Sequence, residues 1–477
     1  MVQDCVLRFI NPFHIKNYNE IKEKNYNDMR LNGWYENSII SGESDLYNYL
    51  TDLFLHEKKS SIGSSWSLEK SKYSQNVYAT KVKNNYIKWR LIRVGLVLFD
   101  TEIGILWYEI KIKTNPWVLD ELQEFVYSIK EMARGDNQEN YLLFAMPEEK
   151  LSQLREDRNI ERLEEKRVKC GYIIKGRIKI HFFEDVLKPW LKGIEIDTFF
   201  ADRKTKEGVL IPDKALLFLW VLNFPETITH LEAVNTVFKL GRGYTKVYTM
   251  DEEIGNTDFL RPFNDSIWYA CLEGCANYMF PIQEKTFYLH GYVSRLEVYF
   301  YLFILCMGQY YSLLQISQDI SELQIGRCRV DCTYDFLERL LNKIHTFNLK
   351  NNYSQVGHLT QQNEFYKYLK TRFNIERMYN ELELKLQLLY RIVEQKRVKK
   401  REKMYNFFSF IGSLFVIVES FGNINQIVEN FLDKEWDIII RQNYFSVLLM
   451  LIVIAIGILG WGIFYIIKIV LKKIMEW

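Results

Sequence analysis

Strong net charge is absent from this sequence. Its 477 residues carry 62 Lys and Arg against 60 Asp and Glu, a formal net charge of +2. A protein that binds nucleic acid through bulk positive charge is therefore excluded. Proline is also scarce, with 8 residues against 31 Tyr and 31 Phe, so few rigid breaks interrupt a chain that can bury a sizeable core.

Sequence patterns of common catalytic sites are also missing. The chain contains no phosphate-binding loop, no HExxH pair of histidines and no nucleophile elbow, and the corresponding enzymes depend on those spacings. We therefore expect a protein that is not an enzyme, with a membrane-tethered enzyme as an alternative. The N-terminus lacks a basic stretch followed by an apolar one, so we expect no signal peptide and a cytoplasmic N-terminal part.

Seven cysteines are present, and we expect them to be reduced in a cytoplasmic protein. Two pairs have the spacing i, i+4: Cys271 with Cys275, and Cys328 with Cys332. Four thiolates can hold zinc, but structural zinc sites more often place their ligands closer together and beside turns. We interpret the pairs as buried thiols that bind no metal, and a zinc site is the alternative.

The longest hydrophobic run is residues 444–467, which contain no charged side chain. About 20 apolar helical residues span a bilayer core, so this run predicts a transmembrane helix, and residues 404–424 predict another. The basic residues at 396–403, the lysines after 467 and the net acidic loop between the spans predict both termini in the cytoplasm. We therefore expect a multi-pass protein of the inner (plasma) membrane.

The first 225 residues alternate between strand-like and helix-like patterns, which predicts an α/β domain with a mixed sheet. Residues 89–112 predict a hairpin, residues 116–133 a helix, and residues 215–224 a buried strand that ends before Pro225.

The pattern becomes mainly helical over residues 226–372. The apolar segment 296–314 is short and contains Glu297, so we expect a buried helix rather than a third span. No proline or glycine occurs in residues 373–403, which predict a stalk helix that runs into the first span. Apolar residues recur along it at alternating steps of four and three, the seam of a coiled coil; they are Ile375, Tyr379, Leu382, Leu386, Leu389 and Val393.

Polar residues follow one face of the first predicted span. Polar side chains in hydrocarbon usually face protein or water, and two helices cannot enclose a pore, so we expect a homo-oligomer around an aqueous path. The alternatives are that these side chains bond neighbouring helices, or that the aromatic face beginning at Phe407 points to the axis. The predicted pore-lining residues are Asn406, Ser409, Ser413, Val416, Glu419, Ser420 and Asn423.

The expected layout is thus a large α/β domain, a stalk helix, a first span, a short external loop at residues 425–443, a second span and a basic tail at residues 468–477. This layout resembles the CorA-like divalent cation transporters, most strongly over residues 373–477. The resemblance implies a homopentamer in contact with membrane lipid, with Mg²⁺ as the ion. The family has a Gly-Met-Asn signature after an aromatic residue; the outer residues here are Phe421, Gly422, Asn423 and Asn425, without the Met-Asn.

The altered signature and the enlarged N-terminal domain are similar to one branch of that family, the CorA-like membrane effectors of type III CRISPR antiviral systems. That resemblance implies a channel gated by a nucleotide second messenger made from S-adenosylmethionine and ATP, an adenylated S-adenosylmethionine-type ligand, with no direct contact to nucleic acid. The alternative is a divalent cation transporter, for which the acidic residues 251–253 are candidate metal sensors.

Residues 240–248, LGRGYTKVY, offer groups that suit such a ligand. Glycines let backbone N–H groups approach a phosphate, an arginine can bind it with two hydrogen bonds, and tyrosine rings can stack on a base. The alternative is a plain turn. Arg261 with Pro262, and Trp268 with Tyr269, are weaker candidates. The predicted ligand-binding residues are Arg242, Tyr244, Lys246 and Tyr248.

Overall fold

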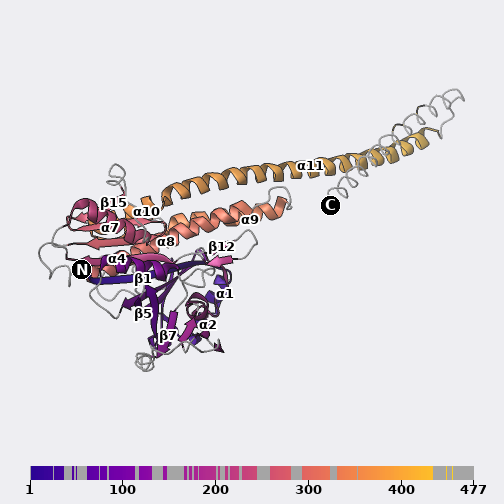
Figure 1. The fold of residues 1–477 in the computed structure, drawn as a ribbon. Helices are drawn as coiled ribbons and strands as arrows, with labels where there is room; N and C mark the ends of the chain where they lie inside the picture. The colour runs from indigo at the N-terminus through magenta and orange to yellow at the C-terminus, as the bar shows by residue number, and fades with distance from the viewer. Residues whose placement is uncertain are drawn as a thin grey trace. The chain divides into compact units, whose positions relative to one another are not determined.

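The computed structural model divides the chain into two compact units, Met1–Val393 and Glu394–Trp477. Figure 1 shows the helices and strands of the described parts. The described residues are 2–24, 26–36, 46–47, 50, 62–74, 76–82, 85–112, 118–131, 143–147, 166–168, 171–174, 177–180, 182–199, 202–204, 210–212, 215–224, 228–243, 258–280, 293–322, 330–351, 353–432, 447 and 454.

A mixed β-sheet forms the centre of the first unit (Figure 1). It does not end at residue 225, as expected for the α/β domain, because three of its strands lie within residues 259–279, a part of the chain that was expected to be mainly helical. In order across the sheet, its strands are β15 (Phe259–Phe263), β16 (Ser266–Cys271), β17 (Gly274–Met279), β14 (Leu216–Asn223), β1 (Val2–Ile15), β6 (Ile103–Ile112), β5 (Asn85–Phe99), β4 (Asn76–Val82), β7 (Leu143–Pro147), β10 (Arg177–Ile180), β9 (Gly171–Ile174) and β8 (Lys166–Val168).

The remaining strands join this sheet at its sides or pair with each other. β14 and β17 run parallel, whereas β1 is antiparallel to both β14 and β6. The additional strands are β11 (Ile196–Phe199), which pairs with β1; β2 (Trp34–Glu36), which pairs with β3 (Gly63–Leu68), itself paired with β5; and β12 (Asp202–Lys204), which pairs with β13 (Leu210–Pro212).

Helices cover both faces of the sheet. Two of the helices, α4 and α7, contribute to one hydrophobic core, and α8, α9, α10 and the start of α11 contribute to the other. The helices are α1 (Tyr18–Glu23), α2 (Asn27–Leu31), α4 (Leu119–Glu131), α6 (Lys188–Trp190), α7 (His230–Arg242), α8 (Val293–Glu322), α9 (Val330–Asn351), α10 (Thr360–Arg372) and α11 (Ile375–Leu432), with a 3₁₀ turn, η1 (Lys70–Lys72), and a π-helical turn, η2 (Phe182–Leu187).

Strand β14 shows why the sheet needs cover on both sides. All eight of its residues are buried. Leu217 and Leu219 point into the core beneath α4 and α7, and Phe218 and Trp220 into the core beneath α8. A strand that is buried on both faces is an uninterrupted apolar run, so the prediction of a buried strand at residues 215–224 is confirmed. The predicted hairpin is also confirmed as β5 and β6, and the predicted helix near residue 119 as α4.

The apolar segment at residues 296–314 lies within α8, between the sheet and α9 (Figure 1). Phe300, Leu302 and Phe303 are each 0 % exposed. The prediction of a buried helix is therefore confirmed.

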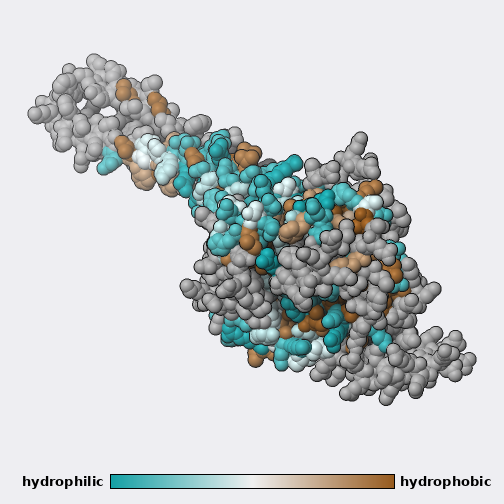
Figure 2. Space-filling view, turned by 90° about the vertical axis from the view of Figure 1, so that its left-hand side faces the viewer, coloured by the Kyte–Doolittle hydropathy of each residue, from teal (hydrophilic) through white to brown (hydrophobic). Residues whose placement is uncertain are grey.

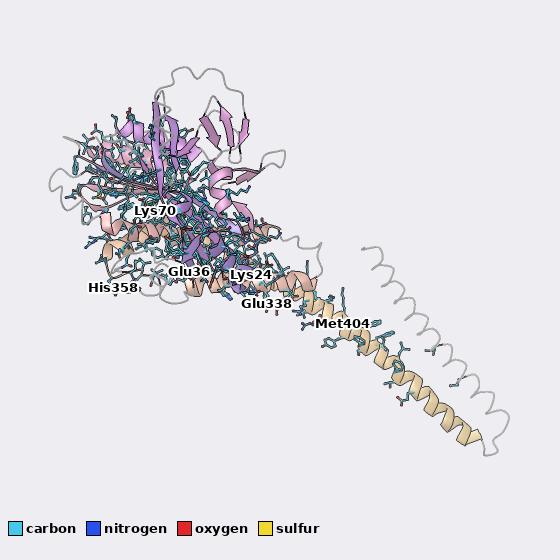
Figure 3. All side chains as sticks on the ribbon, turned by 90° about the horizontal axis from the view of Figure 1, so that it is seen from below. Lys24, Glu36, Lys70, Glu338, His358 and Met404 are labelled. Atoms are coloured by element: carbon cyan, nitrogen blue, oxygen red, sulfur yellow. The ribbon has the colours of Figure 1, made fainter. Side chains whose placement is uncertain are left out.

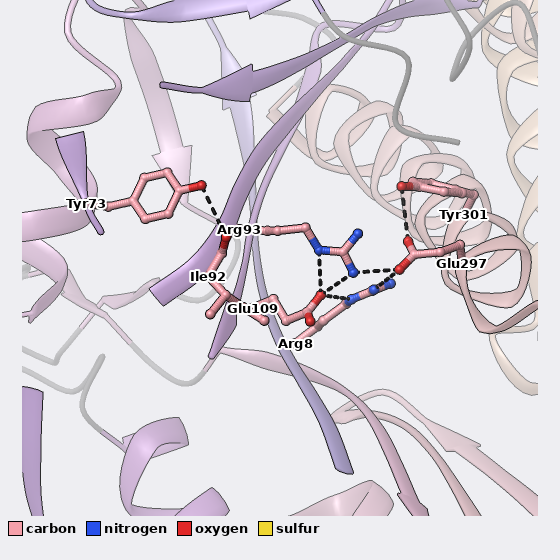
Figure 4. A network of polar contacts seen from close by, with 7 residues as sticks. All are labelled: Arg8, Tyr73, Ile92, Arg93, Glu109, Glu297 and Tyr301. Atoms are coloured by element: carbon pink, nitrogen blue, oxygen red, sulfur yellow. Dashed lines mark hydrogen bonds and ion pairs between the residues drawn. The ribbon is translucent and has the colours of Figure 1, made fainter. Parts of the chain in front are cut away.

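Four charged side chains fix α8 on the sheet (Figure 4). Arg8 of β1 donates from Nε to Glu109 of β6 at 2.8 Å and also binds Glu297 of α8. Arg93 of β5 donates to Glu109 and to Glu297 at 2.5 Å each. Tyr301 donates to the second oxygen of Glu297 at 3.4 Å. Two positive and two negative charges therefore balance within one network, which we call the charge quartet.

The quartet controls the ionisation of the helix residue that takes part in it. Burial alone would raise the pKa of Glu297, but the charges of Arg8 and Arg93 outweigh it and hold that pKa below its usual value. Glu297 therefore stays ionised at neutral pH, and it ties the first turns of α8 to the sheet.

Helix α11 confirms the prediction of a long helix without a break, and it shows what covers the predicted seam. Tyr379, Leu382 and Leu386 are at most 8 % exposed and belong to the core beneath α8 and α9. Tyr379 stacks on Phe347 of α9, with ring centroids 6.1 Å apart. A helix of the same chain therefore occupies this seam, so the seam does not by itself indicate a coiled coil between copies.

No helix in the part of the chain that the structure describes is both long and apolar enough to cross a membrane. This finding contradicts the predicted pair of transmembrane helices. It also contradicts the predicted inner-membrane location and the classification as a CorA-like ion channel of a CRISPR system.

The first predicted span illustrates the correction. Residues 404–424 lie inside α11. Their first residue, Met404, is labelled in Figure 3. Side chains are described without a gap only over residues 404–416. Polar side chains such as Asn406 interrupt the apolar residues of this stretch. The second predicted span, residues 444–467, lies outside the described residues apart from two isolated positions.

Candidate arginine–tyrosine binding site

The end of helix α7 carries the first residue of the predicted ligand segment. Thr229 and Glu232 form a capping box at its start, which stabilises the helix. Gly243 ends the helix with φ of +60°, a left-handed conformation that favours glycine. The second glycine of the Gly-Arg-Gly sequence is thus a helix terminator, and Arg242 is the last helical residue. Tyr244, Lys246 and Tyr248 lie outside the described residues.

Arg242 binds Tyr269 of β16, which was one of the weaker sequence candidates. Its Nε donates to the Tyr269 hydroxyl at 3.1 Å, and its guanidinium carbon lies 4.6 Å from the ring centroid of Phe238. Lys130 of α4 donates to the backbone carbonyl of Arg242 at 2.5 Å. A Cβ on Gly241 would lie 2.6 Å from the Tyr269 ring, so glycine there allows α7 to approach the strand.

A second arginine, Arg372, reaches the same tyrosine from the end of α10. Its guanidinium carbon lies 5.8 Å from the Tyr269 ring centroid, within the range of a cation–π contact. It forms an ion pair with Asp258, and its Nε donates to the carbonyl of Ala270 at 3.0 Å. We call Arg242, Tyr269 and Arg372 the arginine–tyrosine cluster.

The end of strand β15 explains why α10 contacts the sheet here. The pairing of β15 with β16 begins at Phe259 and Tyr269, so Ala270 lies one residue beyond the ladder. Side chains of α10 supply the missing partners: the Ala270 N–H donates to the Tyr368 hydroxyl at 2.9 Å, and that hydroxyl donates to the Asp258 carbonyl at 2.8 Å. The last turns of α10 therefore complete the edge of the sheet.

The cluster holds its tyrosine neutral. Burial raises the pKa of Tyr269 above its usual value, against the opposing effect of Arg242 and Arg372. The hydrogen bond to Tyr269 raises the pKa of Arg242 despite partial burial. The side chains of Arg372 and Asp258 are 22 % and 28 % exposed. Two partly exposed guanidinium groups beside one ring can bind a phosphate, because guanidinium matches its oxygens.

The other weak candidates are placed differently. Trp268 is 0 % exposed on the opposite face of the sheet, where it packs on Phe365 at 4.7 Å, so its ring is not available for stacking on a ligand. Arg261 of β15, which precedes Pro262, donates to the Asn264 carbonyl at 3.0 Å. The acidic residues 251–253 lie outside the described residues.

The cysteines do not form a shared metal site in the described chain. Cys271 faces the core beneath α7 and Cys275 the core beneath α8, so the two thiols lie on opposite sides of the sheet. Burial raises the pKa of Cys271 to about 12 and that of Cys275 well above its usual value. A thiol that stays protonated is a poor ligand. Cys328 and the side chain of Cys332 lie outside the described residues.

The predicted pore-lining and outer residues all lie on α11. The Ser413 hydroxyl donates to the Phe410 carbonyl at 2.8 Å, so the helix itself satisfies this polar group. Positions 421–425 continue the same helix, which ends at Leu432 rather than before residue 425. Of these residues, Asn406, Ser409, Ser413, Val416 and Glu419 are exposed, whereas the side chains of Ser420, Phe421, Asn423 and Asn425 are not described.

Sequence reasoning missed Arg372, Asp258 and Tyr368. Asp258 and Arg372 are 114 residues apart in the chain, and no local motif marks either of them. The only local signal was positional, since Arg372 ends one helix and only two residues separate it from the start of α11.

No family model matches the chain, and no curated protein or solved structure is detectably similar to it. The geometry of the cluster therefore carries the functional argument.

Proposed function

We propose that the chain is a ligand-responsive binding protein, not an enzyme, and that the arginine–tyrosine cluster receives a phosphate-bearing nucleotide. One observation carries the proposal: Arg242 and Arg372 approach the same tyrosine from the ends of two different helices. Charge-assisted hydrogen bonds from two arginines recognise a phosphate, and the adjacent Phe259 offers a partly exposed ring for a base. An adenylated S-adenosylmethionine-type ligand has both features.

The cluster is linked to α11 through a tight corner. Arg372 ends α10, Phe373 is buried, and Asn374 turns the chain with φ of +52° before α11 begins. Lys370 on the α10 side binds Glu376 on the α11 side at 2.9 Å. A ligand that moves Arg372 therefore acts on the residues that set the direction of α11. A response requires that the ligand bind one arrangement of this corner better than another.

Self-association through α11 is part of the proposal. Leu384, Leu388 and Ile392 are 67 %, 60 % and 37 % exposed and recur at intervals of four residues. Leu384 lies ~200° around the helix from the seam residue Leu382, and Leu388 lies ~200° from the seam residue Leu386, so these two leucines face away from the seam. Figure 2 shows hydrophobic residues, in brown, among hydrophilic ones, in teal, on the described part of the surface. An exposed apolar stripe of this kind suits helix packing between copies, and light scattering of the purified chain measures the number of subunits.

Calorimetric titration tests the ligand proposal. We expect the full chain to bind ATP and adenylated S-adenosylmethionine, but not S-adenosylmethionine, which has no phosphate. Arg242→Gln and Arg372→Gln should each weaken binding about tenfold to hundredfold, since a hydrogen bond to a charged group contributes roughly 1.5–3 kcal/mol. Arg261→Gln on β15 is the matched control. Equal affinity of all four proteins for ATP would refute the site.

A further inference from the structure

The contact between Arg372 and Asp258 determines what a ligand must displace. Asp258 lies just before β15, and Arg372 binds its carboxylate through Nη1 while Nε binds the Ala270 carbonyl. The guanidinium edge that faces Asp258 is therefore occupied by an anionic oxygen of the chain itself. Carboxylate and phosphate oxygens make the same kind of hydrogen bond to guanidinium, so they compete for this edge.

The backbone of Asp258 is held independently of its side chain. Its carbonyl accepts a hydrogen bond from the Tyr368 hydroxyl at 2.8 Å. Rotation of the carboxylate away from Arg372 therefore leaves this hydrogen bond and the adjacent β15–β16 ladder in place. Because the Asp258 side chain is 28 % exposed, the displaced carboxylate can be solvated by water.

We propose that the Asp258 carboxylate occupies the place of the ligand's phosphate on Arg372, and that it thereby limits the affinity of the arginine–tyrosine cluster for the ligand. This inference rests on the proposed function. In the empty protein the carboxylate neutralises Arg372 and holds the last turn of α10 against the sheet edge. A bound phosphate replaces the carboxylate on Arg372, so the ion pair between Asp258 and the end of α10 is lost while the Asp258 carbonyl stays bound to Tyr368.

The competition between Asp258 and the ligand also determines which anions the cluster binds. A ligand with one weak anionic oxygen gains little when it displaces a carboxylate, because one ion pair replaces another. A phosphate chain that reaches both Arg372 and Arg242 gains a second charge-assisted contact in the same step. The cluster therefore selects ligands with several phosphate oxygens over simple carboxylates.

The test is a calorimetric titration of the full chain with ATP. Asp258→Asn removes the competing charge and should tighten ATP binding about two- to fivefold, the ratio that corresponds to a partly exposed ion pair of roughly 0.4–1 kcal/mol. Asp258→Ala should act in the same direction and guards against a folding defect peculiar to the amide. The gain should disappear in the Arg372→Gln background, because no guanidinium remains to be released.

Glu381→Gln is the matched control, since it breaks another arginine–carboxylate pair, with Arg377 at 2.8 Å on α11. It should leave ATP affinity unchanged. If the wild-type chain binds ATP and both Asp258 variants bind no more tightly, the inference is overturned and the proposed function stands. A gain that persists without Arg372 also overturns it. If neither the wild-type chain nor either Asp258 variant binds ATP, the proposed function and the inference fail together.

Discussion

Replacing Arg8 by methionine tests whether the charge quartet holds α8 on the sheet. The Arg8 side chain is 1 % exposed and that of Glu109 is 8 % exposed, so the substitution leaves a buried carboxylate with Arg93 as its charged partner within the quartet. Removing one member of a buried ion pair costs about 3–5 kcal/mol. Methionine is shorter than arginine but unbranched and of similar volume, so most of the space is still filled.

The expected change in the free energy of unfolding depends on the contacts that Arg8→Met removes and on those that remain. Arg93 still binds both carboxylates, which places the ionic part near the lower limit, at about 3 kcal/mol. Arg8 also lies 4.3 Å from the ring centroid of Phe300, and loss of this cation–π contact adds about 1 kcal/mol. We therefore expect Arg8→Met to lower the free energy of unfolding by about 3–4 kcal/mol. Glu297→Gln, at a side chain that is 23 % exposed, should cost about 1–2 kcal/mol.

Urea unfolding of the full chain, followed by circular dichroism, measures these differences. Arg377→Met is the control, because that arginine belongs to an exposed pair on α11, and it should leave the midpoint unchanged. The double variant Arg8→Met/Glu109→Leu removes both members of the pair and should be more stable than the sum of the single changes predicts, by about 1–3 kcal/mol. If Arg8→Met unfolds at the same urea concentration as the control, the quartet does not hold α8 in place.

Two further predictions concern other contacts of the first unit. His14 beside Glu102, together with the Lys343 ammonium 2.6 Å away, lowers the pKa of that carboxyl from 4.5 to about 2. Its contribution to stability is therefore complete above pH 4.5 and is lost as the pH falls toward 2, so acid unfolding of Glu102→Gln should show about 1–2 kcal/mol less pH dependence over that interval. Asn374 has φ of +52°, a left-handed conformation that is strained for most side chains. In urea titrations, Asn374→Ala should therefore lower the free energy of unfolding by about 1 kcal/mol, whereas Asn374→Gly should not lower it.

Patterns within one element predicted the parts of the fold that depend on local sequence. The β5–β6 hairpin, the buried strand β14 and the buried helix α8 each follow from a short run of residues and its ends. The order of strands could not be predicted in this way. β1 lies between β6 and β14, and it pairs Phe9 with both Tyr108 and Leu217, which no local pattern records.

The candidate site was predictable only in part, for a similar reason. Arg242 could be proposed because it stands between two glycines, although the second glycine turned out to end a helix. Tyr269 was a weak candidate until the fold brought it to Arg242. Arg372 acquires its role from Asp258, which lies 114 residues away. The apolar residues of the long helix were correctly placed in one seam, but the partner of that seam is α9 of the same chain.

Hydrogen–deuterium exchange of the full chain, with and without ATP, tests the central claim most directly. The claim is that a phosphate-bearing ligand at Arg242, Tyr269 and Arg372 changes the corner between α10 and α11. We predict that ATP changes the exchange of peptides covering residues 258–271 and 365–379, and that Arg372→Gln abolishes both changes. Binding of ATP without any change in these peptides, or changes that persist in Arg372→Gln, would contradict the account.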